Sequence, residues 1–181
     1  MQLIARTVVG ALVSTGLVTT ATAAPAAAYC APDGPTAIWK ITNVSKSFRP
    51  TGLNSDWVHP KYAPFHITYS RSATSTWSAT VTGTVSTEAN AIFAKASASI
   101  SVAVGKQWSK TQTWTYAADT PKDPDHEYRL RQWQETRRFN ATKYGWSNTT
   151  CSYTNKIKAG SGEMPRTTAS SLVWRLQRRA A

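Results

Sequence analysis

Two stretches of the chain, residues 65–86 and 94–116, alternate polar and apolar positions with a period of two. In the first stretch all eleven even positions are polar, and ten of them are Ser or Thr. The second stretch carries most of its apolar bulk at even positions, with hydroxyl or small side chains between them. Because successive side chains of a strand point to opposite sides, this pattern predicts two long strands, each with one hydroxyl-rich face.

The segment between these stretches fits two structures. Ala89, Ile92 and Phe93 continue at helical spacing to Ala96 and Ile100, and the segment is rich in alanine, which predicts a short helix near residues 87–99. If the alternation instead continues, the segment is the turn of a hairpin with Ile92 and Phe93 at its tip. The sequence leaves both structures open.

The rest of the chain predicts further strands at residues 37–44, 127–139 and 170–176, and a loop at Gly160–Gly162. The expected fold is therefore mainly β, an elongated antiparallel sheet or sandwich with long Ser/Thr-faced strands. Its expected buried layer contains Trp39, Trp77, Ile100, Val102, Trp108 and Trp114.

The N-terminal residues predict the compartment. An apolar run over residues 8–18 is too short to span a bilayer but suits the core of a signal peptide. Small residues follow, which allow cleavage after either Ala23 or Ala28. We therefore expect a signal peptide within residues 1–28 and a single secreted, extracellular domain over residues 29–181.

The chain has two cysteines, Cys30 and Cys151. In an oxidising compartment they are expected to pair, because thiols outside the cell are seldom kept reduced. The bond would close a loop of about 120 residues, worth roughly 4 to 5 kcal/mol in the chain-entropy treatment.

Composition narrows the function classes. Only 17% of residues are charged, yet the net charge is +12, so much of the polar surface must be hydroxyl. No phosphate loop, nucleophile elbow or zinc-protease motif occurs, and the cluster Asp123, Asp125, His126 and Glu127 lacks the spacing of a calcium loop. We expect a non-enzymatic protein without a cofactor or bound metal.

Basic residues are interleaved with aromatic ones in one segment of the C-terminal third. Cations in this pattern suit an anionic surface, and a secreted domain meets anionic lipid or cell-wall polymer before nucleic acid, which disfavours nucleic acid as the partner. The expected surface-binding residues are Arg129, Arg131, Arg137, Arg138 and Lys143.

The apolar face of the alternating span offers candidates for membrane insertion, since a bilayer-crossing strand needs about 9 to 11 alternating residues. The candidates are Val81, Val85, Ile92, Phe93, Ile100, Val102 and Val104. In this pattern the span resembles the strand–insertion loop–strand module of aerolysin-type pore-forming proteins, including the epsilon-toxin/Mtx2-like group. Its core at Val85–Lys95 also resembles that of small secreted β-rich proteins of actinobacteria.

The resemblance covers residues 65–139, under half of the chain. It implies a monomer that binds an anionic membrane or cell-wall surface, forms a homo-oligomer and inserts residues 79–104 as a hairpin. The alternative is a non-lytic binding module for cell-wall or extracellular polysaccharide, using exposed aromatic side chains among Trp57, Trp133 and Trp146.

Overall fold

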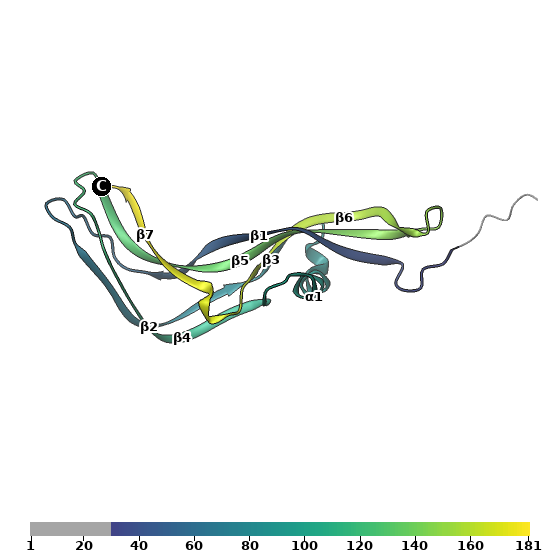
Figure 1. Ribbon diagram of the computed structural model, residues 1–181, viewed down its shortest axis with the longest axis horizontal. Coiled ribbons are helices and arrows are strands. Elements are labelled where there is room, and N and C mark those ends of the chain that lie inside the picture. The colour runs from purple at the N-terminus through teal and green to yellow at the C-terminus, as the bar shows by residue number, and fades with distance from the viewer. Residues whose placement is uncertain (1–29) are drawn as a thin grey trace, which may run out of the picture. The chain divides into compact units, whose positions relative to one another are not determined.

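The computed structural model describes residues 30–181, so the expected signal peptide over residues 1–28 lies outside the described part. The described residues form a mainly β protein with antiparallel strands and one α-helix, as the sequence predicts (Figure 1). The elements in chain order are β1 (Ala37–Asn54), β2 (His66–Ser78), β3 (Thr80–Gly83), η1 (Ser86–Glu88), α1 (Ala89–Ser99), β4 (Gln107–Asp119), β5 (His126–Ser147), β6 (Ser152–Pro165), η2 (Ala169–Ser171) and β7 (Leu172–Ala180).

Strand β5, with 22 residues, is the centre of a five-stranded sheet. One side of β5 pairs with β1 along most of its length. The other side pairs with β7 through residues 126–134 and with β6 through residues 136–147, and β3 extends the sheet beyond β6. The sheet therefore has two halves along β5, one bordered by β7 and the other by β6 and β3.

The prediction of a loop at Gly160–Gly162 is wrong, because these residues lie inside β6. The glycines mark close approaches instead of a turn. A Cβ atom at Gly160 would clash with the carbonyl oxygen of Thr82, and one at Gly162 would clash with the ring of Phe139.

Strands β2 and β4 form a separate two-stranded sheet, paired from His66 opposite Asp119 to Ser78 opposite Gln107. Its hydroxyl-rich face is exposed along its whole length. Hydroxyl pairs at Ser72–Thr113 and Thr74–Thr111 are 2.7 Å apart across the two strands. The predicted one-sided strands therefore exist, although they are shorter than the alternation suggested.

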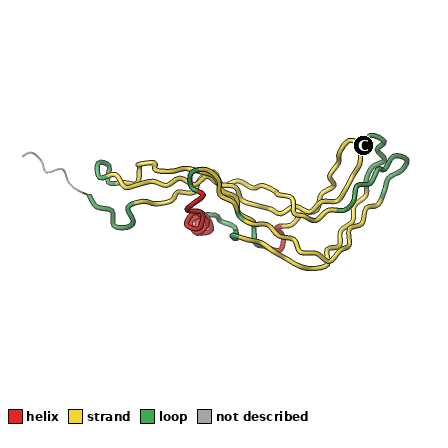
Figure 2. The backbone as a smooth tube through the Cα atoms, turned by 180° about the vertical axis from the view of Figure 1, so that it is seen from behind, coloured by secondary structure: helices red, strands yellow, loops and turns green. Residues whose placement is uncertain are grey.

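The first alternating stretch is divided at Ser78. Beyond this residue the alternation continues into β3, but β3 pairs with β6 and not with β4. The second stretch is likewise strand only from Gln107 onward, and residues 89–99 form α1, which resolves the helix-or-hairpin alternative in favour of the helix (Figure 2). Helix α1 ends at Ser99, because Ile100 has an extended backbone while its N–H still donates to Ala96.

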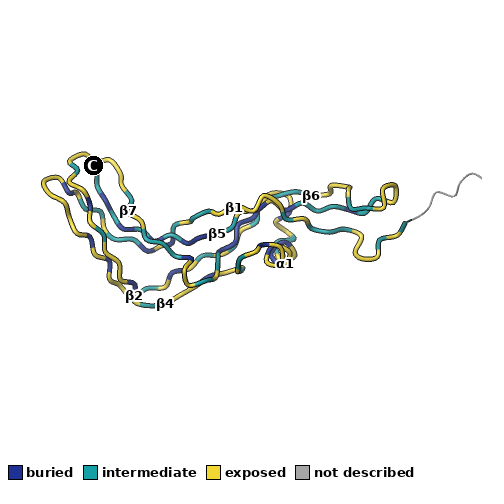
Figure 3. The backbone as a smooth tube through the Cα atoms, viewed as in Figure 1, coloured by how far each residue is buried: buried dark blue, intermediate teal, exposed yellow. Residues whose placement is uncertain are grey.

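Two hydrophobic cores lie along the sheet, and both appear as dark blue stretches in Figure 3. The helix core joins α1 to the half of the sheet that contains β6 and consists of Val85, Ile92, Phe93, Ala96, Ile100, Phe139, Ala141 and Met164. The hairpin core joins β2 and β4 to the half that contains β7 and consists of Leu53, Ile67, Tyr69, Trp108, Trp114, Tyr128 and Leu130. Of the expected buried layer, Ile100, Trp108 and Trp114 are buried, while Trp39, Trp77 and Val102 are half-buried.

Both cysteines of the chain are disulfide-bonded, which confirms the predicted Cys30–Cys151 bond. Such a bond is compatible with an extracellular protein. Among residues 30–181, no helix has the length and apolar character needed to cross a membrane.

Candidate functional site

Residues 79–106, here called the docked segment, leave the β2–β4 sheet and return to it at the same place. Ser78 and Gln107, which flank the segment, are paired across the two strands. The N–H of Ala79 also donates to the carbonyl oxygen of Lys106 at 2.7 Å. Both ends of the segment are therefore attached to adjacent strands, β2 and β4. The segment could move away from the five-stranded sheet without a rearrangement of these two strands.

The apolar side chains of the docked segment form most of the helix core. Of the seven residues predicted to insert, four are buried, namely Val85, Ile92, Phe93 and Ile100. The other three, Val81, Val102 and Val104, are half-buried and pack against the same core. The structure thus brings all seven together, against Phe139, Ala141 and Met164 of the main sheet. Burial of each large side chain stabilises the docked position by about 1.5 to 3 kcal/mol.

Strand β3 attaches the docked segment to the edge of the main sheet. It forms four residue pairs with β6, from Thr80 opposite Glu163 to Gly83 opposite Gly160. The hydroxyl groups of Thr82 and Ser161 lie 3.0 Å apart across this pairing. A four-residue strand at a sheet edge has few hydrogen bonds, so we expect it to open more readily than the long strands.

Glu88, directly before α1, joins the docked segment to the main sheet through two ion pairs. Both oxygens of Glu88 accept hydrogen bonds, one from Lys143 at 2.7 Å and the other from Lys158 at 2.8 Å. These bonds, first that from Lys143 and then that from Lys158, lower the pKa of Glu88 to about 2. Lys143, predicted from sequence to bind an anionic surface, therefore holds the docked segment in this structure.

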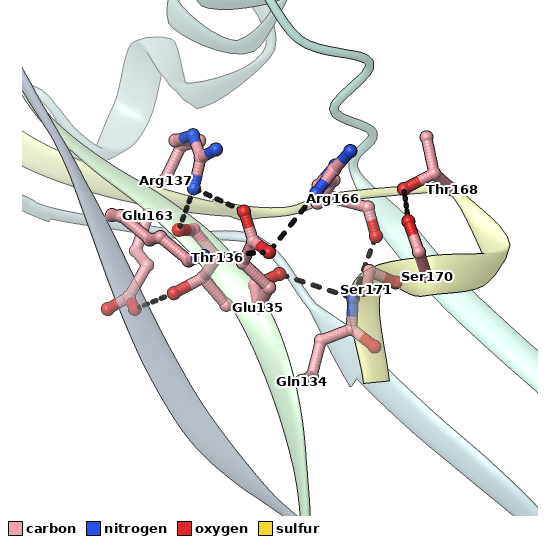
Figure 4. Close-up of polar contacts among 10 residues, drawn as sticks. Gln134, Glu135, Thr136, Arg137, Glu163, Arg166, Thr168, Ser170 and Ser171 are labelled. Carbon is pink, nitrogen blue, oxygen red and sulfur yellow. Dashed lines mark hydrogen bonds and ion pairs between the residues drawn. The ribbon is translucent and has the colours of Figure 1, made fainter. Parts of the chain in front are cut away.

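Two more of the predicted surface-binding residues, Arg137 and Arg138, lie next to buried glutamates. Arg137 is 2.6 Å from Glu135, which also contacts Arg166 at 3.2 Å (Figure 4). Burial by itself raises the pKa of Glu135, but hydrogen bonds from the arginines outweigh burial and keep the pKa below its ordinary value. Arg138 points to the opposite face of the sheet, where its Nε is 4.0 Å from Glu163.

The remaining predicted cations, Arg129 and Arg131, lie on the outer face of the sheet half that contains β7. Their guanidinium groups stack on aromatic rings, Arg129 at 4.4 Å from the centroid of Trp57 and Arg131 at 5.6 Å from that of Trp133. Two residues of β7 complete the arrangement, because Arg175 lies 4.2 Å from Phe48 and Arg179 lies 4.3 Å from Trp57. We call this the arginine–aromatic face, formed by Phe48, Trp57, Arg129, Arg131, Trp133, Arg175 and Arg179.

The arginine–aromatic face has a surplus of positive charge. Within residues 30–181, Arg179 is the only one of its four arginines with a carboxylate partner, Glu127 at 2.6 Å. Burial and then the charges of Arg131 and Arg179 lower the pKa of Arg129. Arg129 and Arg131 each also donate one hydrogen bond to the side-chain oxygen of Gln177, at 3.0 and 3.4 Å. Stacking and these bonds hold the guanidinium groups in place, which favours binding of an anion by their remaining N–H groups.

Sequence reasoning did not include Phe48, Trp57, Arg175 and Arg179 in this set, because they become neighbours only through the pairing of β5 with β1 and β7. A sequence signal exists for part of it: Arg175, Gln177 and Arg179 occupy alternate positions of the last strand. Trp57 and Trp133 are half-buried beneath the arginines, and Trp146 packs edge-on against Tyr153 with ring centroids 5.1 Å apart. None of these three tryptophans is an exposed platform.

The acidic turn at Asp123 is held by internal hydrogen bonds. Tyr128 donates to Asp123 at 2.7 Å and the N–H of Asp125 donates at 3.0 Å, and these bonds keep the pKa of Asp123 below its ordinary value. His66, on the hydroxyl face, contacts Asp119 at 2.6 Å. Within the described range 30–181, no group of three or more His, Cys, Asp or Glu side chains could hold a metal ion.

No protein-family model matches this chain, and a search of the curated proteins finds no match either.

Proposed function

We propose that this protein is a secreted, membrane-active β protein that binds an anionic membrane surface, forms a homo-oligomer and inserts the docked segment as a β-hairpin. The observation that carries the proposal is the register of β2 and β4. Extended without a shift beyond Ser78 and Gln107, this register pairs Val81 with Val104 and Val85 with Ile100. It places the turn at Ile92 and Phe93.

The extended register separates apolar from polar side chains on both arms, apart from Thr87 on the apolar face and Ala103 on the polar face. One face would carry Ala79, Val81, Val85, Ala89, Ala91, Ala94, Ala96, Ala98, Ile100, Val102 and Val104. The other would carry Thr80, Thr82, Thr84, Ser86, Ser97, Ser99 and Ser101, continuous with the hydroxyl face of β2 and β4. Lipid-facing and water-facing strands of membrane proteins need this separation. Neutral hydroxyl groups also cost less to desolvate than charges when the segment passes from its docked position to the membrane.

The dimensions and the flanking residues agree with a bilayer. Each arm of the extended hairpin would have about 13 residues and a length of about 44 Å at about 3.4 Å per residue, more than the roughly 30 Å of a hydrocarbon core. Trp77 and Trp108 are paired at the base of the apolar face, next to Lys106. Tryptophan and lysine at this level are typical of a membrane–water interface.

The resting structure explains how such a segment stays in water. The larger side chains that would face lipid, Val81, Val85, Ile100, Val102 and Val104, lie in or against the helix core in the docked state. Of the apolar side chains on that face, only the small alanines Ala91, Ala94 and Ala98 are exposed. The arginine–aromatic face supplies an attraction to anionic lipid, worth about 1 kcal/mol for each arginine near the surface.

A reversible lock on β3 tests the proposal. Thr82→Cys/Ser161→Cys replaces two hydroxyl groups that lie opposite each other at 3.0 Å, so oxidation would tie the docked segment to β6. Dye release from vesicles of phosphatidylcholine and phosphatidylserine is expected to be absent when the lock is oxidised and restored by reductant. Wild-type protein in the same reductant controls for reduction of the native disulfide.

A second double variant is the matched control. Ser72→Cys/Thr113→Cys joins β2 to β4, where the same hydroxyl geometry occurs at 2.7 Å, and this pairing persists during insertion. We expect full dye release from the oxidised control. Release from the oxidised β3 lock contradicts insertion of this segment. Vesicle binding without release by wild-type protein contradicts pore formation and favours the non-lytic binding module.

A further inference from the structure

A polar groove crosses the open face of the main sheet, on the side away from the helix core. It has a volume of about 280 Å³ and receives side chains from β1, β3, β5 and β6. Its lining includes Asn43, Arg49, Thr80, Thr82, Arg138 and Glu163. A second hollow adjoins it, shares Thr82, Asn140 and Ser161 with it, and is lined at its far end by Lys156.

A β-bulge in β1 directs an amide into this groove. The pairing of β1 with β5 passes from Thr42 opposite Asn140 to Ser45 opposite Arg138, so Asn43 and Val44 share a single partner position. Asn43 has a φ of 53°, in the left-handed region that asparagine tolerates better than most residues. Bulges commonly redirect side chains beside binding sites, and this one places Asn43 in the wall of the groove.

The only carboxylate in the groove is already engaged. Glu163 accepts hydrogen bonds from Arg49 at 2.8 and 3.0 Å and a further bond from Thr136. Burial by itself raises the pKa of Glu163, but these bonds and the arginine charges outweigh burial and hold the pKa below its ordinary value. The carboxylate is therefore ionised and has its hydrogen-bonding capacity largely occupied.

Arg138 provides the more exposed and less tightly paired of the two cations that line the groove. Its side chain is 61% exposed, and within residues 30–181 its charged partner is Glu163, 4.0 Å from its Nε. Around it lie neutral donors and acceptors: the amides of Asn43 and Asn140 and the hydroxyl groups of Ser45, Thr80, Thr82 and Ser161. This set matches a ligand with one anionic group and several hydroxyl groups.

The charge, the lining and the volume of the groove indicate which anionic group and what size of ligand it can bind. A guanidinium can bind either a carboxylate or a phosphate in a bidentate way, but the nearby negative charge of Glu163 repels a doubly charged phosphate more strongly than a singly charged carboxylate. Phe139 is only 2% exposed, so no aromatic ring is available to stack on a neutral sugar. The groove, at about 280 Å³, is at the small end of the roughly 300–1,000 Å³ of ligand pockets, which suits one sugar residue.

We propose that this groove binds a hexuronic acid residue, with its carboxylate on Arg138 and its hydroxyl groups on Asn43, Asn140 and the β3 threonines. Such a ligand would bridge β3, which belongs to the docked segment, to three strands that do not move. Binding to the docked state alone lowers the undocked population, about a hundredfold at a ligand concentration of 100 Kd. This regulatory consequence rests on the proposed insertion of the segment, whereas the binding itself does not.

Titration with D-glucuronate tests the binding. Calorimetry or NMR with the full protein is expected to show saturable binding. Binding of D-glucose, which lacks the carboxylate, and of acetate, which lacks the hydroxyl groups, should each be at least tenfold weaker. Arg138→Gln is expected to weaken glucuronate binding at least tenfold. Arg71→Gln, which removes an exposed arginine of β2 outside the groove lining, should leave binding unchanged. Absence of saturable binding, or unchanged binding by Arg138→Gln, overturns the proposal.

Hydrogen exchange separates this proposal from the proposed function. Saturating glucuronate should slow amide exchange in residues 80–99 of wild-type protein and not of Arg138→Gln. Binding and slowed exchange in a protein that never releases vesicle contents would support the site while contradicting pore formation. Binding that leaves exchange in this region unchanged would overturn the bridging of β3.

Discussion

Glu88 and Lys143 are joined by a hydrogen bond of 2.7 Å between a residue of the docked segment and a residue of the central strand. Lys158 of β6 binds the other carboxylate oxygen, so one acid crosslinks the start of α1 to two strands of the main sheet. We expect Glu88→Gln to release vesicle contents at lower protein concentration than wild type. Asp56→Asn, which removes an exposed carboxylate elsewhere, should leave the concentration dependence unchanged.

The tie at Glu88 also predicts a pH dependence of stability. Its pKa in the folded protein is about 2, below the ordinary value of 4.5, so its contribution is complete above pH 4.5 and is lost as the pH falls toward 2. The difference in Tm between wild type and Glu88→Gln should therefore be largest near neutral pH and shrink over this interval. Circular dichroism melts at several pH values measure it, and a difference independent of pH would contradict this role.

Ala98 and Ser97 are adjacent and exposed in α1, but the extended hairpin would place them on opposite faces. Ala98→Lys adds a cation to the lipid face, which costs about 2 to 4 kcal/mol near the bilayer midplane. Dye release should therefore fall at least tenfold. Ser97→Lys adds the same charge to the water-lined face and should retain release, and both variants should have the Tm of wild type. Equal release from the two variants would rule out the predicted register.

Gly160 allows β3 to approach β6. A methyl group at this position would clash with the carbonyl oxygen of Thr82 and with the side chain of Val85, so β3 must shift. Gly160→Ala should lower the free energy of unfolding by about 1 to 3 kcal/mol, as overpacking does. Faster amide exchange confined first to residues 80–99 would show that β3 is what moves. Gly52→Ala, where the added Cβ meets no atom, is the control and should show neither effect.

The arginine–aromatic face predicts how the protein binds vesicles. Arg129→Gln/Arg175→Gln removes two of its four guanidinium groups and should weaken binding to vesicles with anionic lipid roughly thirtyfold, at about 1 kcal/mol for each residue. Arg71→Gln/Lys61→Gln removes the same charge outside this face. Flotation assays should show a much smaller loss for that control, and equal losses would mean that net charge alone drives binding.

Several features of this protein follow from local sequence alone. The alternation of Ser and Thr with apolar residues predicts the one-sided strands and identifies the hydroxyl face of β2 and β4, since side-chain direction in a strand depends only on position. The same local pattern identifies which apolar side chains of residues 79–104 would share one face if the segment were extended. The two cysteines and their expected compartment predict the disulfide.

Tertiary structure decided which neighbours these faces meet. Alternation does not determine which strand a given strand pairs with. The local sequence therefore did not indicate that β3 pairs with β6 instead of β4, or that Gly160 lies opposite β3. The helical and extended forms of residues 87–99 have similar local support, and the helix forms because it buries Ile92 and Phe93 against Phe139 and Met164. The five cations expected in one surface do not act together. Alternation along β5 turns Arg138 to the opposite side from the other four, and Arg137 and Lys143 are paired with Glu135 and Glu88. Sequence therefore determined the faces of the strands, while long-range packing determined their partners.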